Sequence, residues 1–201
     1  MVEVQVQDRR ERILDRAGAL FASKGVKPTT VREIGDAAGI LSGSLYHHFA
    51  SKEAIIEAIL ARYADDLLVR HQDVVARTGD PEKQLAGLIR ASFESLDAHR
   101  NACAIFQNDY NYLRTLPKFD EQQAKIRQVT QIWMKVLRDG AATGTFRADV
   151  EPRLFHHFAR EAICNSVHWY PGDGRYQIDD VADACIRVLL GGYLSEPRPP
   201  S

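Results

Sequence analysis

The segment GILSGSLYHHFASKE, residues 39–53, concentrates side chains that could hydrogen-bond an anion or the edges of nucleotide bases. Hydroxyl and imidazole groups both donate and accept hydrogen bonds, so they can reach phosphate oxygens and polar base atoms alike. Ile40, Leu45 and Phe49 are the apolar residues that would hold the segment against a core, which leaves the polar groups facing outward. The candidate binding residues of the segment are Ser42, Ser44, Tyr46 and His47.

Helical signals flank this segment on both sides. Apolar residues recur at helical spacing from Ile13 to Phe21, which predicts a first helix over residues 9–24 that ends at Gly25. The sequence TVRE, which starts at Thr30, has the form of a capping box and predicts a second helix that runs to Ala38. Gly39 supplies a turn, and a short third helix follows over residues 42–49. Small residues at 37–39 would let the second and third helices approach closely, as a helix-turn-helix requires.

The remainder of the chain also shows helical periodicity. Ser51 is expected to cap a fourth helix that continues to about residue 77, and no alternating strand pattern of useful length is present. We therefore predict an all-α fold of about nine helices. The expected domains are residues 1–52, a helix-turn-helix DNA-binding domain, residues 53–196, a ligand-binding and dimerisation domain, and residues 197–201, a disordered proline-rich tail. The five later helices are expected at about 81–99, 102–114, 119–142, 151–170 and 178–194.

Composition and charge argue against a general polyanion binder, a membrane-spanning protein and a metal-binding protein. Of 201 residues, 45% are hydrophobic and 26% charged, which is typical of a globular chain. The net charge of −1 argues against a general polyanion binder, although residues 1–52 carry eight Lys and Arg against six Asp and Glu. The apolar runs are too short for a membrane span and the start is polar, so we expect a cytoplasmic protein without a membrane partner. The three cysteines lack metal-site spacing, so no metal or cofactor is predicted.

The stretch TTVREIGDAAGILSGSLYHHFASKEAII resembles the DNA-binding signature of the TetR family of bacterial transcriptional regulators, within a match over about residues 9–59. The resemblance implies that the third helix docks in the major groove of a double-stranded DNA operator. It implies base approach by Ser42 and Ser44. It also implies phosphate contacts by Thr30, Tyr46, His47 and Lys52.

Two residues depart from the family pattern. Leu41 stands where the family usually has a Ser or Thr cap, and Ser42 stands where many members have Lys or Arg. Loss of that cation removes a guanine reader or a phosphate contact, so His47, Lys52 and the arginines of DRRER would carry more of the electrostatic attraction.

The TetR resemblance further implies a homodimer through the last two helices. The segment VADACIRVLLGGYL offers an apolar stripe that suits such an interface, with Gly191 and Gly192 permitting close approach; an intramolecular core is the alternative. Two-fold symmetry would make the operator a near-palindrome. The stripe consists of Val181, Cys185, Val188, Leu189 and Tyr193.

The central helices are rich in aromatic residues, and an apolar cavity with a few placed polar groups is typical of a small-molecule site; most of these rings are nevertheless expected to be ordinary core. Arg160 is the sharpest ligand candidate, because a cation among apolar neighbours needs an anionic partner; a salt bridge or an exposed side chain is the alternative. A narrower resemblance, to the actinobacterial TetR repressors of cholesterol-ring catabolism, implies a coenzyme A thioester as effector. It rests on residues 39–53 and on VHWYPGDG. The other expected ligand-binding residues are Phe106, Tyr110, Trp133, Cys164 and His168.

Three alternatives remain at the level of the sequence. A TetR-like regulator of another hydrophobic ligand, in efflux or drug response, fits the same motifs. His157 and Glu161 share a helix face next to His156 and could suggest a helical enzyme, but a third metal ligand, a phosphate loop and a nucleophile elbow are absent from the sequence. We therefore predict no catalytic residues. A constitutive DNA-architectural protein would not need the large aromatic body.

Overall fold

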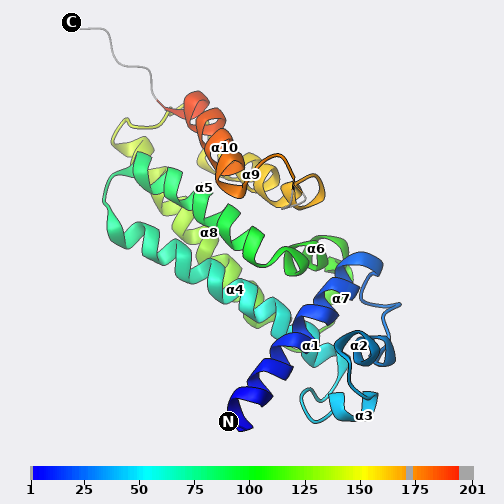
Figure 1. Ribbon diagram of the computed structural model, residues 1–201. Helices are drawn as coiled ribbons and strands as arrows, with labels where there is room; N and C mark the ends of the chain where they lie inside the picture. The colour runs from blue at the N-terminus through cyan, green and yellow to red at the C-terminus, as the bar shows by residue number, and fades with distance from the viewer. Residues whose placement is uncertain (1, 171–173, 195–201) are drawn as a thin grey trace, which may run out of the picture. The chain divides into compact units, whose positions relative to one another are not determined.

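The computed structural model describes residues 2–170 and 174–194, with side chains described from residue 9 onward, and the regular elements in these ranges are all helices. The predicted all-α class is confirmed. The predicted disordered tail, residues 197–201, lies outside the described residues. The elements are α1 Val2–Lys24, α2 Val31–Ala38, α3 Ser42–Leu45, α4 Lys52–Arg77, α5 Pro81–Ala98, α6 Arg100–Asn108, α7 Tyr110–Leu113, α8 Phe119–Ala142, α9 Pro152–Cys164, the 3-10 helix η1 Asn165–His168, and α10 Ile178–Tyr193 (Figure 1).

Three predicted helices need correction, which brings the described α-helices to ten instead of nine. The helix predicted over 102–114 is α6 and α7, separated at Asp109, where the backbone leaves helical geometry (φ −112°, ψ 17°). The helix predicted over 151–170 ends at Cys164 and continues as η1. The third helix is regular only over Ser42–Leu45, and hydrogen-bonded turns complete it to Phe49. Helical periodicity alone does not reveal such interruptions, because the apolar spacing continues through them.

The helices form two compact units, which are described separately. Unit 1 comprises residues 1–64 and 99–124, and unit 2 comprises residues 65–98 and 125–201, within the described ranges. The long helices α4 and α8 contribute to both units. These units group the chain by packing, and the predicted domain boundaries at 52 and 196 stay a functional prediction. None of the helices in the described residues is long and apolar enough to cross a lipid bilayer.

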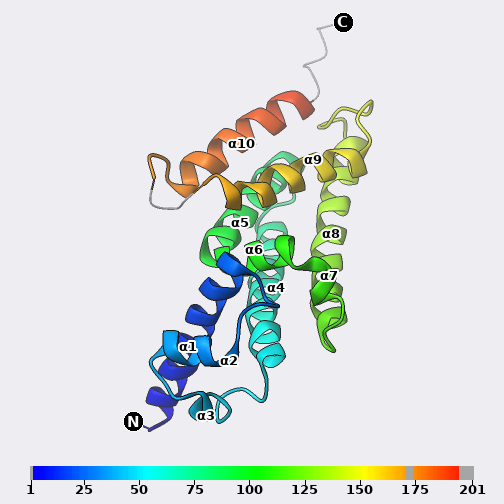
Figure 2. The same ribbon diagram turned by 90° about the vertical axis from the view of Figure 1, so that its right-hand side faces the viewer.

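Unit 1 is built around α1, which packs against α2 and α6, while α3 packs against α2 (Figures 1 and 2). Its core joins the amino-terminal helices to the segment after residue 99. Ile13, Phe21 and Ile34 pack in one buried cluster with Ile105 and Leu113. Because α6 and α7 complete this core, the helix-turn-helix is supported by chain that lies far away in the sequence.

Unit 2 places α5 against both α9 and α10 (Figure 1). Aromatic stacking closes its core at the end of α10, where the Tyr193 ring lies 4.0 Å from the Phe155 ring and 4.9 Å from the Phe146 ring, between centroids. Gly140 admits the Phe146 ring, since a Cβ at residue 140 would lie 2.1 Å from ring carbons.

Candidate nucleic-acid interface

The amino-terminal end of α2 is set by the predicted capping box, which the structure confirms. The Glu33 amide donates to Thr30 Oγ1 over 3.3 Å, and the Thr30 amide donates back to Glu33 Oε2 over 2.8 Å. The Thr30 hydroxyl also donates to Glu33 Oε2. The Lys24 ammonium, bound to the same carboxylate, is the main reason why the pKa of Glu33 falls to about 2. The Thr30 side chain is therefore engaged in starting α2.

The turn between α2 and α3 depends on two glycines. Gly39 adopts left-handed geometry (φ 68°, ψ 35°), which costs a glycine little. Gly35 is the residue of close approach, because a Cβ there would lie 3.0 Å from the Ile40 carbonyl oxygen and 3.4 Å from the Ser42 nitrogen. The sequence pointed to residues 37–39 for this role, but Ala37 is exposed. Gly35 went unnoticed because a glycine inside a short helix gives no sequence signal of what packs on it.

The segment that carries α3 is anchored by apolar residues and exposes Tyr46 and His47, whereas Ser42 and Ser44 are half-buried. Leu45 and Phe49 are buried with Ile34 in the unit 1 core. Tyr46 exposes 55% of its surface, and His47 is also exposed. Within the described residues, the side chains of Ser42, Ser44, Tyr46 and His47 make no hydrogen bond or ion pair, so one short segment carries four polar groups without a partner in the fold.

Lys52, the predicted phosphate contact at the start of α4, binds the protein itself. Its Nζ donates to the carbonyl oxygens of Val26 (2.9 Å), Thr29 (3.0 Å) and Lys27 (3.4 Å). An ammonium group has three donors, and all three are directed at the loop between α1 and α2. The sequence did not suggest this clamp, because the acceptors are backbone atoms more than 20 residues away. A phosphate contact by Lys52 stays a prediction.

A second set of polar contacts ties α6 and α7 to the helix-turn-helix inside unit 1. The Val26 amide donates to Asp109 Oδ2 over 3.3 Å, and the Tyr112 hydroxyl donates to Glu53 Oε1 over 3.2 Å. A backbone hydrogen bond to the Glu53 carboxylate is the main reason why the pKa of Glu53 lies below its usual value, and the hydrogen bonds from Ser51 and Tyr112 lower it further. Any movement of the α6–α7 segment would therefore pull on the loop before α2 and on the start of α4.

The six predicted ligand residues divide between the units. Phe106 and Tyr110 belong to unit 1, where their rings lie 5.7 Å apart and both contact Phe119. The remaining four lie in unit 2. Arg160 is exposed and ion-paired with Glu161, which is the alternative that the sequence analysis left open. The others are Trp133, which is buried, Cys164, which is half-buried and has its thiol pKa raised by burial, and His168, which is exposed.

Two histidines with low pKa values flank Trp133 in unit 2. The His71 ring lies 6.2 Å from the Trp133 ring and the His156 ring lies 5.4 Å from it, between centroids. Burial lowers the pKa of each histidine to about 4, so both are neutral near pH 7. His71 Nδ1 lies 2.7 Å from the Leu67 carbonyl oxygen, which makes Nδ1 the protonated nitrogen, and Nε2 faces Ser92 Oγ at 3.1 Å. His71 escaped the sequence analysis because nothing in its neighbourhood marks it as buried.

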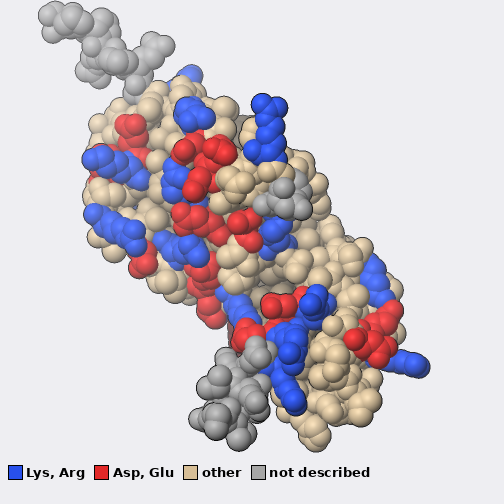
Figure 3. Space-filling view, in the orientation of Figure 1, with Lys and Arg blue, Asp and Glu red and all other residues tan. Residues whose placement is uncertain are grey.

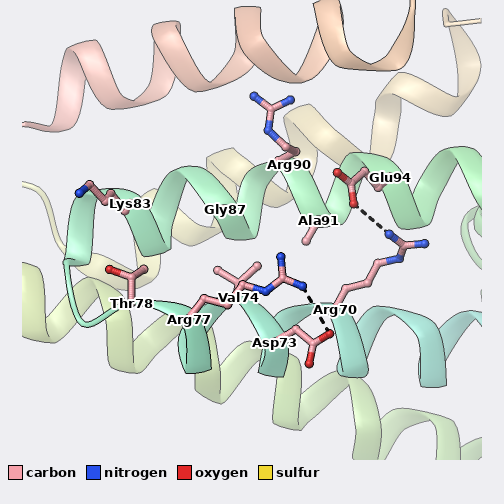
Figure 4. A pocket seen from close by; sticks show the side chains of 10 residues that line it. All are labelled: Arg70, Asp73, Val74, Arg77, Thr78, Lys83, Gly87, Arg90, Ala91 and Glu94. Carbon is pink, nitrogen blue, oxygen red and sulfur yellow. Dashed lines mark hydrogen bonds and ion pairs between the residues drawn. The ribbon is translucent and has the colours of Figure 1, made fainter.

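A groove of about 320 Å³ runs between α4 and α5 in unit 2 (Figure 4). The helices approach closely at Gly87, where a Cβ would lie 2.7 Å from Val74. Each lysine and arginine that lines the groove has an acidic partner, such as Glu94 for Arg70 at 2.9 Å, so the groove does not offer uncompensated positive charge. Its lining residues are Arg70, Asp73, Val74, Arg77, Thr78, Lys83, Gly87, Arg90, Ala91 and Glu94.

The predicted apolar stripe of α10 is divided between the core and the surface. Val181 and Tyr193 are buried within unit 2, so the intramolecular alternative is correct for these two. Val188 exposes 75% of its surface, while Cys185 and Leu189 are half-buried. On α9, Phe158 exposes 59% of its surface. The helices α9 and α10 therefore each expose one large apolar side chain at the surface of unit 2.

No group of three or more His, Cys, Asp or Glu side chains in the part of the chain that the structure describes is arranged to hold a metal ion. His156 turns toward Trp133 at the interior, whereas His157 is exposed.

Two family models match the chain. The model described as bacterial regulatory proteins of the tetR family matches residues 13–59, and the model described as the tetracyclin repressor-like C-terminal domain matches residues 78–193. The chain belongs to the TetR family. The predicted membership is thereby confirmed, and the first match spans the helix-turn-helix described above.

Relatives within the TetR family match nearly the whole chain. The HTH-type transcriptional repressor KstR2 of Mycobacterium tuberculosis strain H37Rv is 39% identical over 192 residues, which is 96% of each chain. KstR2 of Rhodococcus jostii strain RHA1 is 39% identical over 187 residues, covering 93% of this chain and 92% of the relative. The predicted likeness to actinobacterial repressors agrees with these matches.

Two solved structures show the same fold as this chain. The ketosteroid transcriptional regulator KstR2 of Mycobacterium tuberculosis superposes with a TM-score of 0.89 at 39% identity, covering 94% of this chain and 96% of that one. AibR in complex with isovaleryl coenzyme A and operator DNA has a TM-score of 0.77 at 22% identity, covering 90% and 98%, and shows the shared fold alone.

Proposed function

We propose that this chain is a cytoplasmic repressor that leaves its operator when a small-molecule effector binds. The observation that carries the proposal is the match to KstR2 repressors over 96% of each chain, combined with a short segment, residues 42–47, whose four polar side chains make no hydrogen bond within the described residues. In the proposed complex, Ser42 and Ser44 approach base edges in the major groove. Tyr46 and His47 bind phosphate oxygens.

Thr30 and Lys52 contribute to the proposed interface mainly by fixing the start of α2 and the loop that precedes it. Thr30 starts α2, and the Lys52 ammonium fastens the loop before it while leaving a positive charge at the start of α4. Both residues stay in the proposed DNA-binding set, because a fixed charge near a phosphate favours binding without a direct hydrogen bond.

The proposed repressor is a homodimer through α9 and α10. Exposed apolar side chains on both helices, Phe158 and Val188, support this interface, since burial of such groups stabilises a dimer. Gly191 and Gly192 leave open space beside the α10 backbone, where a second copy could approach. A two-fold dimer would bind a near-palindromic operator whose half-sites lie about 34–36 Å apart or a larger multiple of the groove repeat.

The proposed effector is a coenzyme A thioester from lipid or steroid catabolism. KstR2 is a ketosteroid transcriptional regulator, which supports an origin in steroid catabolism, and AibR was solved with isovaleryl coenzyme A, which supports the thioester. Inside unit 2, Trp133 offers an apolar ring between two neutral imidazoles, and the buried Ser95 hydroxyl has no partner within the described residues. Trp133 and Cys164 would contact the acyl part, and the exposed Arg160 and His168 would meet polar groups of the effector.

Effector binding would lower operator affinity through linkage between the two sites. Couplings of this kind typically change affinity roughly 5–150-fold. Asp109 and Tyr112 contact Val26 and Glu53, which flank the helix-turn-helix, and these contacts would supply a physical connection inside unit 1.

A mobility-shift assay on the region adjoining the chain's own gene, titrated with coenzyme A thioesters, tests the proposal. Tyr46→Ala should weaken binding to every duplex, whereas Ser44→Ala should blur preference at one base position of each half-site. Lys83→Ala is the control. Lys83 belongs to unit 2 and lies far along the sequence from residues 42–47, so its removal should leave binding unchanged. Equal binding of all duplex sequences by the unaltered protein would refute sequence-specific repression.

A further inference from the structure

Leu41 is the most exposed large apolar side chain in the described residues. It exposes 80% of its surface, and it stands directly before the first residue of α3. An isolated exposed leucine is ordinary on most surfaces. Leu41, however, lies at the start of the helix that is proposed to enter the major groove, so its side chain would lie at the DNA interface.

The fold does not require a leucine at this position. Leu41 is the N-cap of α3, with extended geometry (φ −66°, ψ 142°), and its side chain makes no capping bond. The cap is formed by its backbone, whose carbonyl oxygen accepts from the Ser44 amide at 2.8 Å and from the Leu45 amide at 3.2 Å. A serine or threonine would cap the helix better, since its oxygen could also accept a backbone hydrogen bond. Local stability therefore does not explain the leucine.

The segment around Leu41 carries no charged side chain. Residues 37–51 contain no Lys, Arg, Asp or Glu, and the corresponding surface of unit 1 is free of charged side chains in Figure 3. Gly43 lies two residues away, and a Cβ built there meets no atom within 4 Å. A DNA edge could thus approach the backbone closely, with Leu41 as the protruding apolar group.

Only one group in the major groove is apolar, the C5-methyl group of thymine. We propose that Leu41 is a specificity-determining residue that selects thymine in each half-site by packing on this methyl group. The inference rests on the proposed function. Leu41, which stands where the family usually has a Ser or Thr cap, would recognise a base by apolar contact. The hydroxyl groups of Ser42 and Ser44 then read the neighbouring polar edges.

The test uses DNA that lacks only the methyl group. The full-length protein first selects its preferred duplexes from a random library. Each thymine of the selected site is then replaced by uracil, one symmetric pair at a time, and dissociation constants are measured by fluorescence anisotropy at fixed salt. The proteins compared are the unaltered chain, Leu41→Ala, and the control Val69→Ala, which shortens another exposed apolar side chain, in unit 2.

We expect one symmetric thymine pair at which uracil weakens binding by the unaltered chain and by Val69→Ala about fourfold per half-site, the value of one buried methyl group. Leu41→Ala should lose most of this discrimination at that pair and keep the discrimination at all others. If every thymine-to-uracil effect were the same in Leu41→Ala as in the unaltered chain, the role of Leu41 would be disproved while the proposed function stood. If no duplex sequence were selected, both would fail.

Discussion

Removal of the Lys52 ammonium is the most direct test of how the helix-turn-helix is held. Lys52→Ala deletes three hydrogen bonds to the loop between α1 and α2, two of them at 2.9 and 3.0 Å. A hydrogen bond from a charged group contributes about 1.5–3 kcal/mol when well shielded; partial exposure lowers this to about 1–1.5 kcal/mol for each of the two shorter bonds, and the third, at 3.4 Å, adds little. We expect the free energy of unfolding to fall by about 2–3 kcal/mol. For a chain of this size the thermal midpoint should drop by roughly 4–12 °C, measured by circular dichroism at fixed protein concentration.

Two further variants make this result interpretable. Lys27→Ala removes an exposed lysine from the same loop and should change the free energy of unfolding by less than about 0.5 kcal/mol. Lys52→Met keeps most of the aliphatic stem and should behave like Lys52→Ala, because the lost hydrogen bonds matter more than packing. If Lys52→Ala were as stable as Lys27→Ala, the clamp would not exist in solution. A phosphate contact is tested separately: it predicts that Lys52→Met lowers the salt slope of operator binding by about one.

Three more predictions concern the turn, the surface of α3 and the interior of unit 2. Gly35→Val should destabilise the fold by about 1–3 kcal/mol in urea titrations, since its side chain would press on the Ile40 carbonyl. Gly43→Ala should raise the unfolding free energy by about 0.5–1 kcal/mol, because its Cβ meets open space in a helix, yet weaken operator binding in mobility shifts. The pKa of His71 is about 4 in the folded protein, against 6.5 for an ordinary histidine. Between pH 4 and pH 6.5 the His71 side chain is therefore neutral in the folded protein and takes up a proton when the protein unfolds. Its contribution is therefore complete above pH 6.5 and is lost as the pH falls toward 4, by up to about 3 kcal/mol. His71→Gln should show a shallower loss of urea stability over this range, and an unchanged pH dependence would contradict the buried neutral state.

Local signals in the sequence predicted the local structure well. Thr30 and Glu33 form the predicted capping box, and Gly39 has the left-handed geometry expected of a turn. These features depend on neighbours within four residues, so a short pattern contains all the information needed. The carboxyl end of α4 at Arg77 and the start of α5 at Pro81 were predicted for the same reason.

Features that depend on distant chain could not be read in this way. The carbonyl acceptors of Lys52 lie more than 20 residues away and become its neighbours only after the chain folds. Val181 and Tyr193 share the helical spacing of Val188, and periodicity shows that a face is apolar without showing which chain covers it. The separation of Phe106 from Trp133 into different units was likewise invisible, because aromatic content carries no information about grouping.

The shared core of unit 1 sets a rule for anyone building chimeric regulators. Ile105, Leu113 and Phe119 pack in the same cluster as the apolar residues of α1 and α2. A chimera that joined only the first 52 residues to a new ligand-binding domain would lack Ile105, Leu113 and Phe119. The apolar residues of α1 and α2 that pack against them would then be exposed to solvent. The transplantable cassette must carry residues 99–124 along with residues 1–64, or the recipient must supply an equivalent lining.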